Sequence, residues 1–184
     1  MLRLPVSDGE LGVARKETTR MIDGKMEEAL NKHANAEFYS SYLYLSMSAF
    51  FQSLNLTGFA HWMRVQAREE LAHAMKFYDH VIERGGRVTL QPVEAPPLRW
   101  DSPLAVFEES YRHEKEVTAL INRLVDEAVQ TRDHATNNFL QWFVSEQVEE
   151  EASVEAIVQN LKLVGDSVGG QFMIDRELAQ RTAG

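Results

Sequence analysis

The chain has 184 residues, of which 44% are hydrophobic and 26% are charged, a composition typical of one globular domain. Its formal charge of -9 argues against nucleic-acid binding, which needs a basic face, and the absence of cysteine excludes disulfides and thiolate metal sites. No apolar run is long enough to cross a membrane and no secretory signal is recognisable at the start, so we expect a cytoplasmic protein.

The first half of the chain predicts an irregular arm followed by two long helices. Residues 1–20 contain proline, glycine and scattered charges without helical spacing. Apolar residues at steps of three and four predict a first helix from near Met21 to about Gln52. A second helix is predicted from an N-cap at Thr57 to about Arg84, and the glycine pair that follows marks its end.

The second half predicts two more long helices and a short one. Asp101 or Ser102, followed by proline, is typical of a helix start and predicts a third helix that ends near Gln130. A tight link over 131–135 leads to a fourth helix that ends near Gly165. A short fifth helix is expected after the next glycine pair, Gly169 and Gly170.

The lengths of the links predict the topology. Links of a few residues make helices one and two antiparallel, and likewise three and four. Between the pairs lies a link of about sixteen residues with three prolines, which can extend about 50 Å. Helices of nearly thirty residues are about 40 Å long, so this link can cross the whole bundle. The sequence therefore predicts an all-α, up-down-down-up four-helix bundle with one crossover over residues 21–184.

Polar residues interrupt the apolar face of each long helix near its middle. These residues are Glu37, then Glu70 with His73, then Glu114, and finally Gln147 with Glu150. The middle is the one level that antiparallel helices share, so we expect these side chains to meet in one buried layer. An unpaired buried ion costs several kcal/mol, so four acids in a core indicate that cations neutralise them.

The composition of this layer indicates a di-iron centre. Carboxylates and an imidazole suit ferrous iron and related first-row ions. Four carboxylates carry a charge of about -4, which two divalent ions cancel and one ion does not. His33 and His80 also lie on the apolar faces, but the carboxylate layer does not require them, so we interpret both as core or rim histidines.

At these positions the sequence resembles the non-haem ferritins, particularly those of bacteria. The matching segments are Ala36–Ser41, Arg68–His73, Tyr111–Glu114 and Phe139–Glu151, which occur in order along the chain from Met21 onward. The resemblance implies a ferritin-like four-helix bundle with a short fifth helix, a ferroxidase centre in each subunit, and a 24-subunit cage that stores ferric mineral. Its implied substrates are Fe(II) and dioxygen or hydrogen peroxide.

The resemblance also implies roles for individual residues. Glu37, Glu70 and His73 match the ligands of the first iron, with Glu70 bridging to the second. Glu114 and Glu150 match the ligands of the second iron, beside Gln147. Tyr44 matches a tyrosine next to the centre, and Trp142 a nearby tryptophan. The acids that match an outer, third iron site are Glu69, Glu146, Glu149 and Glu150.

Departures from related families limit the alternatives. Haem-containing bacterioferritins carry a second Glu-x-x-His motif on the fourth helix, but here Ser153 stands three residues after Glu150, so no haem is expected. Two other hypotheses stay open at this point. One is a di-iron oxidase or peroxidase that retains its metals, and the other is a passive cage or scaffold that binds metal without turning it over.

Overall fold

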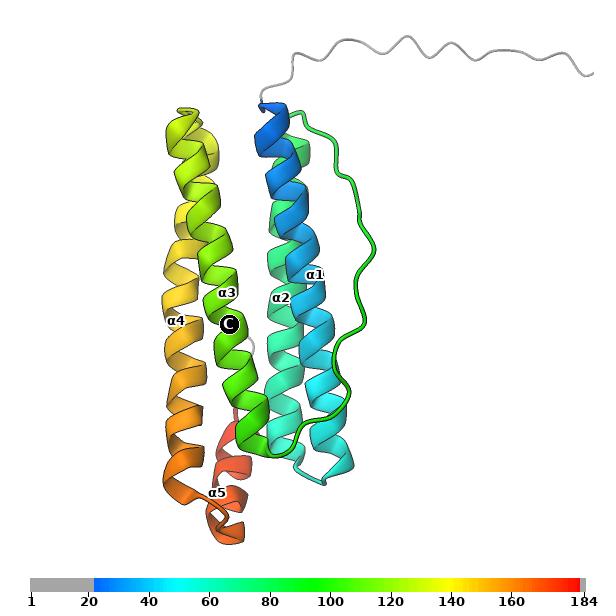
Figure 1. The fold of residues 1–184 in the computed structure, drawn as a ribbon, viewed down its shortest axis with the longest axis vertical. Coiled ribbons are helices and arrows are strands. Elements are labelled where there is room, and N and C mark those ends of the chain that lie inside the picture. The colour runs from blue at the N-terminus through cyan, green and yellow to red at the C-terminus, as the bar shows by residue number, and fades with distance from the viewer. Residues whose placement is uncertain (1–21, 183–184) are drawn as a thin grey trace, which may run out of the picture.

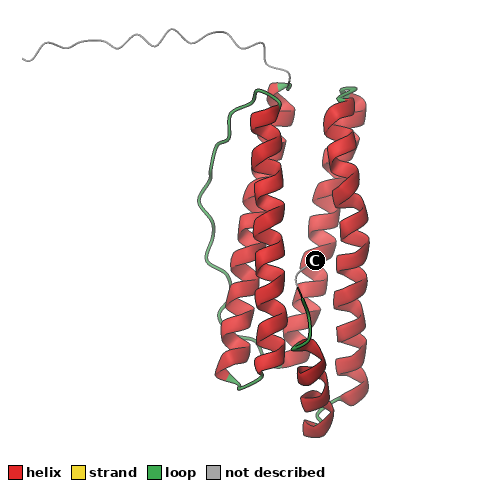
Figure 2. Ribbon diagram, turned by 180° about the vertical axis from the view of Figure 1, so that it is seen from behind, coloured by secondary structure: helices red, strands yellow, loops and turns green. Residues whose placement is uncertain are grey.

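Five helices and their links make up the computed structural model, which describes residues 22–182 (Figure 1). The helices are α1 (Gly24–Ser53), α2 (Thr57–Glu83), α3 (Pro103–Gln130), α4 (His134–Val164) and α5 (Val168–Leu178). No strand occurs within these residues, as the colouring of Figure 2 makes plain. The predicted arm over 1–20 lies outside the described residues. None of the described helices has both the length and the apolar content needed to span a bilayer.

The predicted topology is confirmed. Tight turns join α1 to α2 and α3 to α4, and the long link between α2 and α3 runs down the outside of the bundle (Figure 1). Hydrogen bonds fasten this crossover to α1: the Asn31 side chain donates to the carbonyl of Arg87 at 3.0 Å and accepts from the amide of Thr89 at 2.8 Å. Further along, the Ser46 hydroxyl donates to the carbonyl of Pro97 at 2.5 Å. The link is therefore held in its extended path.

Of the two helix caps predicted from the sequence, one is confirmed and the other is wrong. Ser102 caps α3, because its hydroxyl accepts a hydrogen bond from the amide of Ala105 at 3.1 Å. The predicted Thr57 cap was wrong: Thr57 is the first helical residue of α2, and Leu56 stands at the N-cap without a side-chain cap. Two amides of this helix start, those of Gly58 and Phe59, donate instead to Asp175 Oδ1 at 2.8 and 3.0 Å.

The start of the fifth helix was also predicted too late. α5 begins at Val168, with Ser167 as its side-chain cap, and so contains both glycines in its first turn. The second glycine allows close packing rather than marking a stop: a Cβ on Gly170 would lie 2.7 Å from the Cβ of Val164 at the end of α4. A glycine pair is ambiguous in sequence because close packing and helix termination both select it.

Docking of α5 on α2 leads to a stability prediction. A Cβ on Gly58 would lie 1.6 Å from the carbonyl oxygen of Asp175, so Gly58→Ala must push α5 away and break both capping hydrogen bonds. We expect a loss of about 2–4 kcal/mol in unfolding free energy, measured by thermal unfolding followed by circular dichroism. Gly24→Ala is the matched control, because nothing lies within 4 Å of its Cβ position. Equal stability of the two variants would contradict the docking argument.

The bundle core consists of two apolar clusters with a polar layer between them. One cluster includes Met47, Phe51, Phe59 and Phe107, and the other includes Met26, Leu30, Phe77 and Phe143. Members of each cluster come from all four long helices. The polar residues of the middle therefore lie inside a packed hydrocarbon interior, away from both ends of the bundle.

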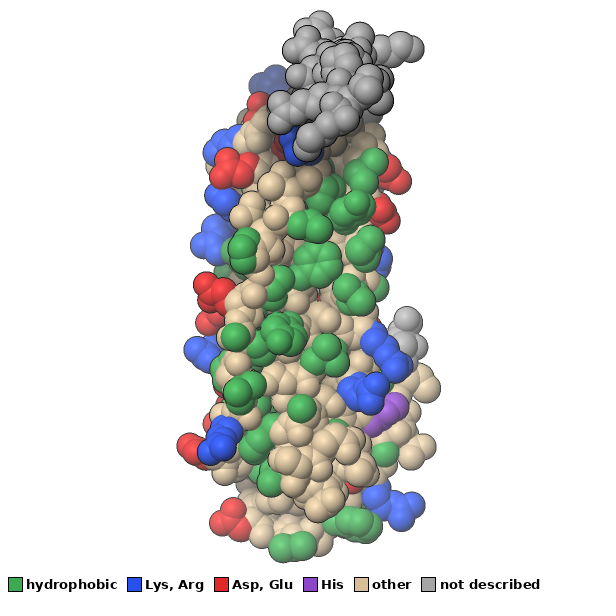
Figure 3. Space-filling model, turned by 90° about the vertical axis from the view of Figure 1, so that its right-hand side faces the viewer, with side chains coloured by type: hydrophobic (Ala, Val, Ile, Leu, Met, Phe, Trp, Pro, Cys, Tyr) green, Lys and Arg blue, Asp and Glu red, His purple; other side chains and the backbone are tan. Residues whose placement is uncertain are grey.

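One face of the molecule exposes many apolar side chains. Figure 3 shows hydrophobic side chains in a column along the side that carries the crossover. Exposed apolar residues of α1 and the crossover are Tyr42, Leu45, Leu90, Val93 and Leu98. Extended apolar surfaces of this kind mark contacts with other proteins.

Candidate metal centre

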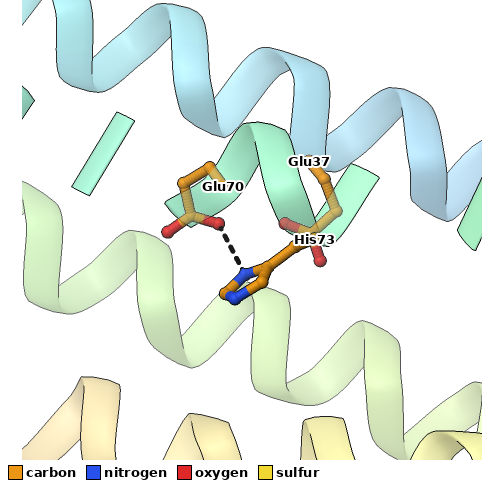
Figure 4. Close-up of side chains that lie close together, drawn as sticks. All are labelled: Glu37, Glu70 and His73. Atoms are coloured by element: carbon orange, nitrogen blue, oxygen red, sulfur yellow. Dashed lines mark hydrogen bonds and ion pairs between the residues drawn. The ribbon is translucent and has the colours of Figure 1, made fainter. Parts of the chain in front are cut away.

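Three of the predicted ligands converge in the middle of the bundle. Glu37 reaches in from α1, and Glu70 and His73 project side by side from α2 (Figure 4). All three are buried, and each offers a ligand atom within 4.8 Å of the others. The i, i+3 spacing of Glu70 and His73 places both on one face of α2, as the sequence predicted.

The hydrogen bonds of these acids include two partners that the sequence analysis did not assign to the site. Gln66 Nε2 donates to Glu70 Oε1 at 2.7 Å, while Glu70 Oε2 lies 3.3 Å from His73 Nδ1. His33 Nε2 lies 2.8 Å from Glu37 Oε1. Gln66 and His33 both stand on the polar-interrupted helix faces, four residues before the acid that each contacts, and that spacing was the available signal.

The second half of the layer comes from α3 and α4. Glu114 is 1% exposed, and its Oε1 accepts a hydrogen bond from the hydroxyl of Tyr44, also fully buried. Gln147 Nε2 donates to Glu114 Oε2 at 3.2 Å. Glu150, one turn further along α4, is 5% exposed. The structure thus buries in the bundle interior every residue that the sequence proposed for the inner pair of irons.

The acids proposed for the outer, third site are only partly brought together. Glu146, His73 and Glu150 offer ligand atoms within 4.8 Å of one another. Glu69 instead accepts a hydrogen bond from Arg181 at 2.5 Å, and Glu149 is exposed. Trp142 lies beside this region, with its ring centroid 5.4 Å from that of His73. The second group therefore uses His73, which no sequence argument had placed there, and not Glu69 or Glu149.

Burial and mutual repulsion make three acids of the layer reluctant to ionise, whereas the pKa of Glu37 is lowered. Burial raises the pKa of Glu114 well above its ordinary value, and the nearby charges of Glu70 and Glu150 raise it further. Burial and the Glu70 charge raise the pKa of Glu150 to about 7. The pKa of Glu70 is also raised, mainly by burial, although its hydrogen bond with His73 opposes the shift. A nearby divalent cation would reverse these shifts, because it favours the ionised carboxylates.

Unpartnered atoms inside the layer fit the binding of metal ions. Glu37 Oε2 and Gln66 Oε1 are buried and have no hydrogen-bond partner among the described residues. Buried polar atoms are rarely left without partners in folded proteins, because each such atom costs about 1–3 kcal/mol. Hard oxygen donors with one or two imidazoles are the ligands that ferrous and ferric iron take. The donor set and the excess of negative charge therefore suit a pair of divalent ions.

Comparison with protein families and curated relatives gives one consistent answer. A family model described as a ferritin-like domain matches residues 27–164. The bacterial non-heme ferritin of Bacteroides fragilis (strain 638R) is 45% identical over 161 residues, which cover 88% of this chain and 100% of the relative. The bacterial non-heme ferritin of Escherichia coli O6:H1 is 39% identical over 86% of this chain and 96% of the relative. These matches confirm the resemblance inferred from the motifs.

Solved structures similar to this chain are also ferritins. An open pore ferritin from the archaeon Archaeoglobus fulgidus superposes with a TM-score of 0.88 at 56% sequence identity, over 89% of this chain and 99% of that one. A closed form of the Archaeoglobus fulgidus ferritin, engineered by site-directed mutagenesis, superposes with a TM-score of 0.87 at the same identity. The fold and most of its length are therefore shared with proteins from two domains of life.

Proposed function

Because this chain belongs to the ferritin family, we propose that it stores and detoxifies iron by oxidising Fe(II) and depositing ferric mineral inside a multi-subunit cage. The observation that carries the proposal is the buried layer of Glu37, Glu70, His73, Glu114 and Glu150. Such a layer is costly in an apolar core without cations. The relatives named as non-heme ferritins support iron as the cation. The cytoplasmic location expected from the sequence is part of the same proposal.

In the proposed reaction, iron is the substrate and the carboxylates are its temporary ligands. Glu37, Glu70 and His73 receive one Fe(II), and Glu114 and Glu150 receive the other, with Glu70 bridging. Each Fe(II) gives up one electron, so the pair supplies the two electrons that reduce dioxygen to hydrogen peroxide, or hydrogen peroxide to two waters. Carboxylate ligands favour the ferric state, and the few nitrogen ligands leave the product able to depart. The sharing of one buried carboxylate keeps the two ions close.

The residues around these ligands have distinct proposed roles. Tyr44 donates to Glu114 and so orients its carboxylate, and Gln66 does the same for Glu70. His33 holds Glu37 through one oxygen and leaves the other oxygen for metal. The group of His73, Glu146 and Glu150 is proposed as a third iron position, through which iron passes to or from the pair. Partners that orient metal ligands in this way commonly change metal affinity or activity 10–100-fold when removed.

We further propose that 24 copies assemble through surfaces that include the apolar face of α1 and the crossover. That face exposes Leu90 and Leu98 by 67% and 76%, and burying it against a second copy would remove this apolar area from water. The structural neighbours are ferritins described by the state of their pores, open in one case and closed in another. A hollow assembly provides the enclosed volume in which the ferric product can accumulate.

One loading experiment tests storage against the two alternatives. The chain is loaded with Fe(II) under anaerobic conditions and then exposed to air, with oxidation followed optically and particle size followed by sedimentation. We expect oxidation much faster than in buffer, with hundreds of irons retained per large particle. Fast oxidation with about two irons per chain on a monomer or dimer would indicate an oxidase or peroxidase that keeps its metals. Oxidation no faster than in buffer would indicate a passive scaffold.

A further inference from the structure

A chain of hydrogen bonds connects the candidate centre to the outer side of α4. Gln147 Nε2 lies 3.2 Å from the backbone oxygen of Glu114, 3.2 Å from its Oε2, and 3.3 Å from Thr118 Oγ1. The Thr118 hydroxyl in turn donates to Glu151 Oε1 at 2.5 Å. Thr118 and Glu151 were not part of the site predicted from sequence. They lie one turn beyond Glu114 on α3 and next to Glu150 on α4.

The chemistry of these groups fixes the direction of every bond in the chain. The backbone carbonyl of Glu114 can only accept, so the atom of Gln147 that faces it is the amide nitrogen. Thr118 has one hydroxyl proton, which it donates in its hydrogen bond to the Glu151 carboxylate. The Thr118 oxygen therefore presents a lone pair to Gln147, which again requires the amide nitrogen. The backbone oxygen of Glu114 and the hydroxyl oxygen of Thr118 both accept from the amide nitrogen of Gln147. These two bonds prevent the amide from turning its oxygen toward Glu114.

We propose that Thr118 and Glu151 are positioning residues that hold Gln147 as a hydrogen-bond donor to Glu114. This inference deepens the proposed function and rests on it. With Tyr44 donating to Oε1 and Gln147 donating to Oε2, both oxygens of Glu114 are held in place. The carboxylate keeps a free lone pair on each oxygen and presents it in a fixed direction to the second iron. Gln147 then acts as a donor beside this iron, and its amide nitrogen is not a ligand.

The surface around Glu151 supplies a matched control. A recess of about 280 Å³ between α3 and α4 is lined by Thr118, Gln147, Glu151 and Glu155, among others. Glu151 and Glu155 stand one turn apart on α4 and carry the same charge into the same recess. Among the described residues, only Glu151 of these two hydrogen-bonds to Thr118. Removing either acid changes the surface charge equally, but only removal of Glu151 frees the Thr118 hydroxyl.

The test uses the assembled protein and four variants: Thr118→Val, Thr118→Ser, Glu151→Ala and Glu155→Ala. Fast oxidation of Fe(II) is measured first, and then the visible absorption of Co²⁺ bound without oxygen, which reports the geometry of the metal ligands. We expect Thr118→Val and Glu151→Ala to slow oxidation by about tenfold and to change the Co²⁺ bands. Thr118→Ser restores the hydroxyl and should retain the wild-type rate and bands, as should Glu155→Ala.

The outcomes separate the two proposals. Wild-type rates and Co²⁺ bands in Thr118→Val would overturn the positioning role, and so would equal losses in Glu151→Ala and Glu155→Ala. If Thr118→Val does not fold, the pair Glu151→Ala and Glu155→Ala decides alone, because both residues are on the surface side of α4. Absence of fast oxidation in the unaltered protein would instead remove the proposed function. In that case the Co²⁺ bands still decide whether Thr118 and Glu151 position Glu114.

Discussion

Replacing Glu70 by alanine is expected to abolish the fast phase of Fe(II) oxidation and leave only the rate seen in buffer. Glu70 contacts His73, and its charge raises the pKa of both Glu114 and Glu150. Its loss removes the proposed bridge between the two irons. Stopped-flow absorbance after mixing with Fe(II) and air measures the fast phase. An unchanged fast phase would take Glu70 out of the centre.

Glu70→Gln adds a second readout to the same position. Glutamine keeps the size of the side chain and removes its charge, so we expect the fast phase to be lost here as well. The metal-free protein should nevertheless become more stable, because a buried acid whose charge repels those of Glu37, Glu114 and Glu150 has gone. Glu28→Gln is the control, because Glu28 is an exposed acid on α1 that pairs with Lys32. Glu28→Gln should noticeably change neither the fast phase of oxidation nor the stability of the metal-free protein.

Divalent cations are expected to raise the unfolding temperature strongly, and more so at higher pH. An ion that binds only the folded state stabilises it by about 4 kcal/mol at a thousand times its dissociation constant, or about 10 °C for a chain of this length. Zn²⁺ is a suitable probe because it accepts carboxylate and imidazole ligands without redox chemistry. Mg²⁺ at the same concentration should have little effect, because it gives up its water reluctantly.

The pH dependence follows from the raised pKa values. Between the ordinary glutamate pKa and the raised value of about 7 for Glu150, the acids of the layer whose pKa values are raised hold more protons in the folded protein than in the unfolded chain. The contribution of these acids to the stability of the metal-free protein should therefore fall as pH rises through this window. With Zn²⁺ the trend should reverse, because metal binding needs deprotonated carboxylates and releases their protons. Calorimetry at pH 6 and pH 8, with and without Zn²⁺, measures both trends. Parallel trends would contradict the burial of these acids in one layer.

The polar layer was predictable because periodicity alone brings its members together. Residues at steps of three and four share a helix face, and the helix middle is the level that all four long helices have in common. The spacing in the sequence therefore predicted Glu37, Glu70, His73, Glu114 and Glu150 as members of the layer. It could not find which polar neighbour each acid uses, because a shared face does not determine a rotamer. Gln66 and His33 lay on the predicted faces but could not be assigned to an acid.

Contacts between distant segments were beyond what the sequence could show. Asp175 caps α2 from a position 117 residues further along the chain, so the local pattern at Thr57 pointed to the wrong cap. Arg181 likewise reaches Glu69 across 112 residues, a contact that the sequence analysis did not predict. In both cases α5 or the residues after it supply the partner. A short helix has too little periodicity to predict how it docks.

The dependence of α2 on Asp175 has a consequence for biosynthesis. A nascent chain in which all four long helices have been synthesised still lacks Asp175, the acceptor for the amides of Gly58 and Phe59. Folding of the chain can therefore reach completion only after translation has passed residue 175. Prematurely terminated products would retain an exposed, uncapped helix start, and this defect distinguishes them from full-length chains.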